Sequence, residues 1–362
     1  MTSRPLSAVV LAAGEGTRMR SSRPKPLHRL CGRPMVLHVL DALAELEVDR
    51  VVVVVGHRAE WVTKTLVEHA PQGVEIEFVE QVEQHGTGDA MSVALTGLPD
   101  ELDVDGDVVV LPGDTPLLRP ATLAALVRHH RASDAAATLL TAVIEDPSGY
   151  GRVVRGRDEV VARVVEHADA DEEELAVHEV NTSIYCFRRS VLAPSLRRLS
   201  PANAQGEYYL TDVVGVLYEA GHRVVSVVVD DTMEVAGVND RAQLAVAEAE
   251  LRDRINERWM RRGVTMWDPE RTYIDSDVQL SPDVVLLPGV ILQGECRVAE
   301  HAEIGPNCHL VDTLVGEGAH IAHSVTRRAE IGGEAKVGPF AVLGEGEVVP
   351  AGGAVGPVSE AR

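Results

Sequence analysis

Residues 8–19 read AVVLAAGEGTRM, a run of small aliphatic residues that passes directly into a glycine-rich turn. A short aliphatic run bounded by a turn predicts a buried strand. Similar runs are RVVVVV at 50–55, IEFVE at 76–80 and DVVVLP at 107–112, and the amphipathic stretch MVLHVLDALAEL at 35–46 predicts a helix between the first two strands. Strands that alternate with helices are typical of βαβ units. We therefore predict an α/β domain whose sheet is mixed and mostly parallel.

Between residues 133 and 190, strand-like segments follow one another without strong helices. They are TLLTAVIE, GRVVRG, VARVVEH and EVNTSIYCFRR. This pattern indicates a mixed-sheet insertion that carries a substrate. Residues 241–263 then form a long charged stretch that ends at Gly263, and they predict one connecting helix.

Beyond Tyr273, aliphatic residues recur every six positions. The series is Ile274, Leu280, Leu286, Leu292, Val298, Ile304 and Leu310, and it resumes as Val325, Ile331, Val337, Leu343, Val349 and Val355. A hexapeptide repeat of small turn residues and inward aliphatic residues predicts a short parallel β-helix, in which each rung stacks on the next. The repeat also accounts in part for an aromatic content of only 3%. It slips between residues 311 and 324, where we expect an outward loop.

The length of 362 residues allows two or three domains, each with its own core. We expect the α/β domain at residues 1–240, a connecting helix at 241–263 and the β-helix at 264–362. A formal net charge of −22 argues against nucleic-acid and anionic-membrane partners, because the general field repels phosphate. An anionic substrate then needs a local cluster of cations and backbone amides.

Targeting and redox signals are weak. The apolar runs are far shorter than the ~20 residues of a membrane span. The four cysteines lie far apart, without metal-ligand spacing, and indicate reduced thiols. We therefore expect a cytoplasmic protein.

The turn after the first strand carries the clearest chemical signal. Glycines at 14 and 16 allow backbone amides to approach phosphate oxygens, and Arg18 and Lys25 follow closely. The dinucleotide fingerprint would need a glycine at Met19, and the phosphate-binding P-loop would need a GK[ST] sequence. Neither is present, so the segment predicts a glycine turn with two cations that clamp a polyphosphate.

The string LAAGEGTRMRSSRPKPLH at 11–28 resembles the N-terminal motif of sugar-1-phosphate nucleotidylyltransferases, most closely the bacterial N-acetylglucosamine-1-phosphate uridylyltransferase family. Further matching blocks are QVEQHGTGDA (81–90), PGDTPL (112–117), DPSGYGR (146–152), VVEH (164–167), EVNTSIY (179–185), NAQGEYYLTD (203–212) and EVAGVND (234–240). The blocks keep their order and approximate spacing across residues 6–245. The resemblance implies a Rossmann-like nucleotidyltransferase domain followed by a left-handed β-helix.

The resemblance also implies roles for individual residues. The nucleotide-binding set would be Leu11, Ala12, Ala13, Gly14, Lys25, Gln81, Gly86, Thr87, Gly113 and Asp114, with Gln81, Gly86 and Thr87 reading the uracil. The sugar-binding set would be Gly151, Glu166, Asn181 and Asn239. Asp114 and Asn239 would bind Mg²⁺, a hard cation that accepts such oxygen ligands. Arg18 and Lys25 would be the catalytic cations.

Each of these polar residues also has a simpler interpretation. Asp114 is a typical turn former before Pro116, Asn239 could cap a helix that begins near Arg241, and Glu166 could be a surface charge. Taken singly, these alternatives stay open.

The implied reaction is in-line attack by a phosphate oxygen of N-acetylglucosamine-1-phosphate on the α-phosphorus of UTP, which releases pyrophosphate. The same chemistry with N-acetylgalactosamine-1-phosphate, glucose-1-phosphate or dTTP is the main alternative. An alternative of another class is a hexapeptide acyltransferase with His301, His309, His320 or His323 as its base.

Bifunctional members of the family use a longer β-helix to acetylate glucosamine-1-phosphate. In them a GPF segment is followed by LRPG, whereas here Gly344 follows Leu343 and the chain given ends at Arg362. We therefore expect no acetyltransferase activity, and a homotrimer through the β-helix is a further expectation.

Overall fold

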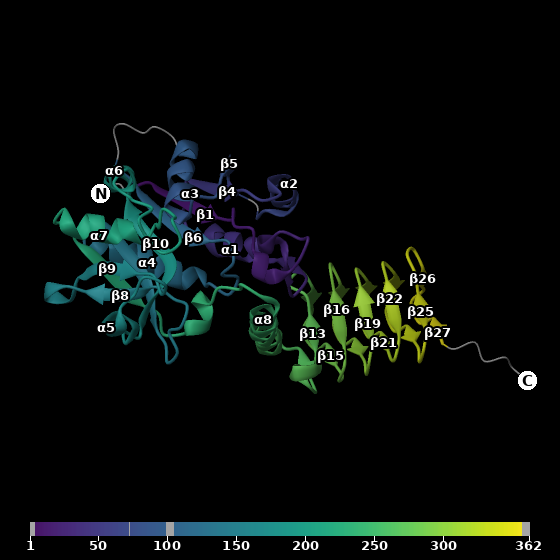
Figure 1. Ribbon diagram of the computed structural model, residues 1–362. Helices are drawn as coiled ribbons and strands as arrows, with labels where there is room; N and C mark the ends of the chain where they lie inside the picture. Colours follow the sequence, from purple (N-terminus) through teal and green to yellow (C-terminus); the bar gives the residue numbers. More distant parts are fainter. Residues whose placement is uncertain (1–3, 72, 99–104, 357–362) are drawn as a thin grey trace, which may run out of the picture. The chain divides into compact units, whose positions relative to one another are not determined.

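A mixed β-sheet in the order β11-β7-β10-β6-β1-β4-β5 forms the centre of the N-terminal two thirds of the chain (Figure 1). The computed structural model describes residues 4–71, 73–98 and 105–356. Its strands there are β1 (Leu6–Leu11), β4 (Arg50–Val55), β5 (Ile76–Glu80), β6 (Asp107–Pro112), β7 (Ala137–Val143), β8 (Arg152–Arg155), β9 (Val161–Val165), β10 (Glu179–Arg188) and β11 (Val224–Val228). The predicted strands at 50–55, 76–80 and 107–112 are confirmed, and the first strand begins two residues earlier than expected. The expected burial is wrong for β5, which lies at the end of the sheet and has no fully buried residue.

The sheet is mixed in the manner that the sequence predicts. β1 pairs in parallel with β4 and β6, and β4 with β5, whereas β10 is antiparallel to β6, β7 and β8. β8 and β9 form an antiparallel pair at the side of β10. These strands are the predicted insertion within residues 133–190.

Helices cover both faces of this sheet. They are α1 (Met35–Ala44), α2 (Ala59–His69), α3 (Thr87–Ala94), α4 (Pro120–Ala132), α5 (Glu172–Leu175), α6 (Arg189–Leu196) and α7 (Asp212–Glu219). Successive residues of β1 point to opposite faces, so Ala8 and Val10 pack with α1, α2 and α4, while Val9 packs with α3, α6 and α7. Burial on both faces explains why β4 and β6 are continuous aliphatic runs.

The carboxyl ends of β1, β4, β5 and β6 lie at one edge of the sheet because these strands are parallel. The antiparallel β10 brings its beginning, near Asn181, to the same edge. Open α/β sheets bind their ligands at this edge.

A parallel β-helix makes up most of the C-terminal third of the chain, as predicted, and it is left-handed. Strands of two or three residues stack into the sheets β12-β15-β18-β21-β24-β27, β13-β16-β19-β22-β25 and β14-β17-β20-β23-β26. Their bounds are β12 (Thr265–Met266), β13 (Tyr273–Ile274), β14 (Gln279–Leu280), β15 (Val285–Leu286), β16 (Ile291–Gln293), β17 (Arg297–Val298), β18 (Glu303–Ile304), β19 (His309–Val311), β20 (Leu314–Val315), β21 (His320–Ile321), β22 (Val325–Arg327), β23 (Glu330–Ile331), β24 (Lys336–Val337), β25 (Val342–Leu343), β26 (Val348–Val349) and β27 (Ala354–Val355). The hexad series is buried inside the coil, apart from Val325, which points outward, and Val355, which is partly buried.

The expected outward loop at 311–324 is wrong. Ile291 pairs with His309, 18 residues on, whereas His309 pairs with Val325, only 16 residues on. The coil is therefore shortened rather than extended. The tight corners carry buried hydroxyls: Thr313 donates to the carbonyl of Val311 at 2.9 Å, and Ser324 to that of Ala322 at 2.7 Å. These local bonds satisfy backbone carbonyls where a six-residue rung loses one residue.

Contacts divide the chain into residues up to His28 with Pro34–Leu244, and Arg29–Arg33 with residues from Ala245 on. The segment Arg29–Arg33, with β2 (Arg29–Leu30) and the start of β3 (Arg33–Pro34), belongs to the second unit because the Cys31 amide donates to Glu248 on α8 (Arg241–Arg261) at 2.8 Å. The sequence-based boundaries at 240 and 263 stay predictions, and residues 1–3 and 357–362 of those ranges lie outside the described residues. No helix in the described part of the chain is long and apolar enough to cross a membrane.

Candidate active site

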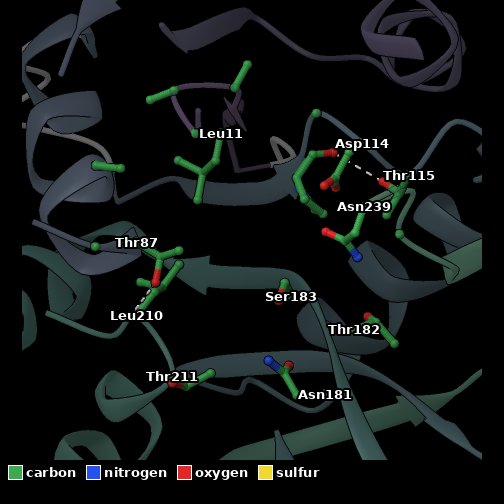
Figure 2. A pocket seen from close by; sticks show the side chains of 18 of the residues that line it. Leu11, Thr87, Asp114, Thr115, Asn181, Thr182, Ser183, Leu210, Thr211 and Asn239 are labelled. Carbon is green, nitrogen blue, oxygen red and sulfur yellow. Dashed lines mark hydrogen bonds between the residues drawn. The ribbon is translucent and has the colours of Figure 1, made fainter. Parts of the chain in front are cut away.

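A cavity of about 480 Å³ opens at the carboxyl edge of the parallel strands in the first unit. Its walls include every residue expected to bind nucleotide, sugar or metal. These are Leu11, Ala12, Ala13, Gly14, Lys25, Gln81, Gly86, Thr87, Gly113, Asp114, Gly151, Glu166, Asn181 and Asn239. Figure 2 shows Asp114 and Asn239 together on one side and Asn181 with Thr211 on another. Arg18 lies next to the cavity wall, where its Nη2 donates to Asn239 Oδ1 at 2.9 Å.

Lys25 joins two oxygen-bearing side chains of this cavity. Its Nζ donates to Asn239 Oδ1 at 2.7 Å and forms an ion pair with the Asp114 carboxylate. Lys25 follows β1, Asp114 follows β6 and Asn239 precedes α8, so three chain segments meet on one ammonium group. The two oxygens converge on a single point that a cation occupies.

Gly16 explains how Lys25 reaches that point. Its φ of +64° lies in the left-handed region, and a Cβ on it would lie 2.5 Å from the Cβ of Lys25. Gly14 differs, because a Cβ there would meet nothing within 4 Å. The two glycines of the turn therefore do different things: Gly16 makes room for Lys25, and Gly14 leaves backbone open to the cavity.

A second turn forms the wall around Gly86, at the start of α3. Gly86 has a φ of +104°, and a Cβ on it would lie 2.6 Å from the carbonyl oxygen of Tyr208. The Thr87 hydroxyl accepts a hydrogen bond from the Leu210 amide at 3.0 Å. The buried Gln81 donates to the carbonyl of Gly86 at 3.2 Å, which ties the end of β5 to this turn. The wall is thus rigid and dense with backbone amides and carbonyls.

The opposite wall is built on β8, β9 and β10. The Asn181 amide donates to the carbonyl of Gly151 at 2.8 Å. The Asn181 side chain is 5% exposed; its Nδ2 donates to the Tyr185 hydroxyl at 2.7 Å, while its Oδ1 has no partner among the described residues. Burial raises the pKa of Tyr185, so this hydroxyl stays protonated. The wall therefore presents a free, buried hydrogen-bond acceptor.

Glu166 lies beside Gly151 on the same wall. Burial raises the pKa of its carboxyl group, and the carboxylates of Asp212 and Asp169 raise it further, although the Thr211 hydroxyl donates to Oε1 at 3.0 Å and opposes the shift. Glu166 is thus not a solvated surface charge but a partly desolvated acceptor.

The geometry also bears on the simpler interpretation of Asn239. The side chain that caps α8 is Asp240, whose Oδ1 accepts from the amides of Ala242 at 2.9 Å and Gln243 at 2.8 Å. The Asn239 side chain points instead to Lys25 and Arg18. The Asp114 carboxylate likewise pairs with Lys25, and the Asp114 backbone carbonyl accepts from the Val238 amide at 2.9 Å.

Comparison with known proteins agrees with this geometry. The family model described as nucleotidyl transferase matches residues 7–267. The chain belongs to the nucleotidyl transferase family. It is 48% identical over 360 residues to the Bifunctional protein GlmU of Streptomyces avermitilis, covering 99% of this chain and 74% of that protein. The protein of the same name from Thermobifida fusca is 49% identical over 331 residues, 91% of this chain and 68% of that one. The one from Shouchella clausii is 45% identical over 342 residues, 94% and 73% respectively.

In this nucleotidyl transferase, several lining residues were not singled out from the sequence. They include Gln84, Tyr150, Ser183, Glu207 and Thr211. Gln84 Nε2 donates to the carbonyl of Ala13 at 2.8 Å and so fastens the glycine turn. All five lie within the quoted motif blocks, so the signal was position inside a block rather than residue type.

The four histidines of the acyltransferase alternative lie in the β-helix of the same nucleotidyl transferase. His309 Nε2 lies 2.8 Å from the side-chain oxygen of Gln293, and the ring of His323 lies 5.8 Å from that of Phe340. Two of the four imidazole rings, those of His309 and His323, thus already contact another side chain.

Proposed function

We propose that this protein transfers the uridylyl group of UTP to N-acetylglucosamine-1-phosphate, forming UDP-N-acetylglucosamine and pyrophosphate. The observation that carries the proposal is the cavity, with cations at one side and a free buried acceptor at the other. Lys25 and Arg18 supply positive charge for a polyphosphate in a chain whose net charge is −22. Asn181 and Glu166 supply acceptors for an amide N–H and hydroxyl groups.

The reaction needs no covalent enzyme intermediate. A phosphate oxygen of the sugar phosphate attacks the α-phosphorus of UTP, a new P–O bond forms, and the bond to the β-phosphate oxygen breaks with release of pyrophosphate. Catalysis then rests on alignment of the two phosphates and neutralisation of their charge. Lys25 and Arg18 perform the second task, and the backbone of the turn around Gly14, which faces open space, contributes amide donors.

Asp114 and Asn239 fit a divalent cation. Their carboxylate and amide oxygens already share one positive group, the Lys25 ammonium. Mg²⁺ is usually held by one or two carboxylates, with water and substrate phosphates completing its shell. Among the described residues no group of three or more His, Cys, Asp or Glu side chains could hold a metal. We propose that the phosphates of the substrate complete the site. Bound there, Mg²⁺ would supply charge neutralisation at the phosphates.

A panel of nucleotides and sugar phosphates tests this proposal. Pyrophosphate release is measured for UTP and dTTP, each with N-acetylglucosamine-, N-acetylgalactosamine- or glucose-1-phosphate. We expect the highest kcat/KM for UTP with N-acetylglucosamine-1-phosphate and loss of turnover when EDTA removes the metal. A higher kcat/KM for glucose-1-phosphate would contradict the role of Asn181 as acceptor for an acetamido N–H.

We also propose that the β-helix mediates self-association. Along the sheet β13-β16-β19-β22-β25, Tyr273, Val325 and Val342 are 44%, 46% and 76% exposed, so apolar side chains repeat on its outer surface. Light scattering should report an oligomer that Val342→Glu weakens; a monomer at all concentrations would contradict the idea.

The cytoplasm, where UTP is available, remains the proposed location.

A further inference from the structure

Arg152, the first residue of β8, is a buried cation in the substrate-binding half of the molecule. It is 2% exposed, and no ion pair of its guanidinium exists among the residues that the structure describes. The exposed Asp146 carboxylate interacts with this guanidinium electrostatically, but from beyond ion-pair distance. Burial of a charge without a directly paired counter-charge costs several kcal/mol unless hydrogen bonds compensate. The free-energy cost of burying Arg152 therefore suggests that the side chain has a functional role.

The contacts of Arg152 join two segments. Nη1 donates to the carbonyl oxygen of Tyr150, and Nη2 lies 3.5 Å from Nδ1 of His167. Nε has no partner in the described part of the chain. Tyr150 immediately precedes Gly151, and His167 immediately follows Glu166. One guanidinium therefore links Tyr150, a cavity residue next to Gly151, to His167, the residue that follows Glu166.

The strand register shows why these contacts matter for the cavity. Arg152 lies opposite Val180 on β10 and opposite Val165 on β9. The adjacent positions are Gly151, Asn181 and Glu166, all of which line the cavity. Because successive residues of a strand point to opposite faces, Arg152 lies behind the wall that these three residues form.

We propose that Arg152 is a positioning residue for the sugar-phosphate substrate, which fixes Gly151 and Glu166 relative to each other through Tyr150 and His167. The inference rests on the proposed function and names a residue outside the cavity that sets the shape of one of its two walls. The nucleotide wall, built on the Gly86 turn, has no hydrogen bond or ion pair with Arg152 in the described residues.

The test compares two variants by steady-state kinetics with UTP and N-acetylglucosamine-1-phosphate. Arg152→Met removes both contacts, and we expect the KM for the sugar phosphate to rise about tenfold while the KM for UTP changes less than about twofold. Arg152→Lys retains the charge but can reach only one of the two acceptors, so its KM for the sugar phosphate should be intermediate. Thermal unfolding is recorded for each variant.

Arg155→Met is the matched control on the same strand. Arg155 pairs with Glu179 at 2.7 and 2.9 Å and does not line the cavity, so its loss should lower stability without changing the ratio of the two KM values. Unchanged sugar-phosphate KM in both Arg152 variants, or a parallel rise of both KM values, would overturn the inference. If Arg152→Met does not fold, an unchanged KM in Arg152→Lys overturns it. The unmodified protein is assayed in parallel. If it turns over UTP and N-acetylglucosamine-1-phosphate, a failed Arg152 test refutes only the role of Arg152; if it does not, the proposed function itself is refuted, and the inference with it.

Discussion

Lys25 Nζ and Asn239 Oδ1 lie 2.7 Å apart, although 214 residues of sequence separate them. The same ammonium group pairs with Asp114, and the Asn239 oxygen also accepts from Arg18. A lysine thus occupies the point where two oxygen ligands converge. Substrate phosphates bound as proposed would give the lysine a new anionic partner and would leave the two oxygens to a divalent cation.

Replacement of Lys25 or Asp114 should abolish most of the activity. We expect Lys25→Met and Asp114→Asn each to lower kcat/KM by at least ~10²-fold, the usual effect of losing one preorganised electrostatic contact. Lys64→Met is a control, because the Lys64 side chain is 75% exposed and its partner Glu68 lies at 3.9 Å. Rates close to those of the unmodified protein in both site variants would contradict the assigned roles.

Gly16 should be far less tolerant of substitution than Gly14. In Gly16→Ala an alanine must adopt a left-handed backbone conformation, which costs about 1–2 kcal/mol. Its methyl group would also clash with the Cβ of Lys25. We expect a lower free energy of unfolding and a marked loss of turnover. Gly14→Ala, where the methyl group meets nothing within 4 Å, should leave the free energy of unfolding nearly unchanged. Equal stability of the two variants in urea unfolding would argue against this distinction.

The elements that the sequence predicts well are those whose hydrophobic pattern leaves little choice. Five consecutive valines at 51–55 are buried in β4, and the hexad aliphatics stack inside the coil. The exceptions depend on contacts between distant residues. Cys31 meets Glu248 across 217 residues, and no local pattern marks Arg29–Arg33 as part of the β-helix unit. The five-residue corners of the coil likewise depend on hydroxyls at Thr313 and Ser324, which resemble ordinary loop residues in sequence.

The candidate site likewise has a part that the sequence predicts and a part that depends on contacts in the folded chain. The motif blocks predict which residues line the cavity. They do not predict which other residues form the hydrogen bonds that orient them. Gln84 and Asp240 lie inside quoted motif blocks, but their roles follow only from hydrogen bonds in the folded chain: Gln84 holds the glycine turn, and Asp240 caps α8 and leaves Asn239 free for Lys25.

Glu166→Gln should raise stability at neutral pH while it weakens sugar binding. Burial raises the folded-state pKa of Glu166, so the ionised carboxylate costs stability above its unfolded pKa. That cost grows as the pH rises from the unfolded to the folded pKa and then stays constant. The variant avoids it, so its gain in Tm should be present at pH 7 and vanish in acid.

The kinetic half of this prediction has the opposite sign. In Glu166→Gln the new amide retains one acceptor oxygen but loses the charge, and charged hydrogen bonds contribute about 1.5–3 kcal/mol, so the KM for the sugar phosphate should rise at least about tenfold. A variant with lower Tm at pH 7, or with unchanged KM, would contradict the assignment of Glu166 as a desolvated substrate ligand.

Asp107, at the opposite end of β6 from the cavity, should control stability in acid. Its side chain is fully buried, and Arg131 Nε donates to its Oδ2 at 2.8 Å, while His130 Nε2 lies 3.5 Å from Oδ1. Burial alone would raise the pKa of Asp107, but these two partners lower it below its ordinary value. The stabilisation is therefore complete above the unfolded pKa, near pH 4, and is lost as the pH falls through the lower folded pKa.

Asp107→Asn measures this stabilisation directly. Removal of one member of a buried ion pair costs about 3–5 kcal/mol, so the variant should lose this amount of unfolding free energy at pH 7 and much less near pH 2. Asp134→Asn is the control, because the Asp134 side chain is 71% exposed beside Arg4 and Arg188 and should contribute little. Denaturant unfolding from pH 2 to 7 compares both variants with the unmodified protein. A pH-independent difference for Asp107→Asn would show that the carboxylate charge is not what stabilises this end of the sheet.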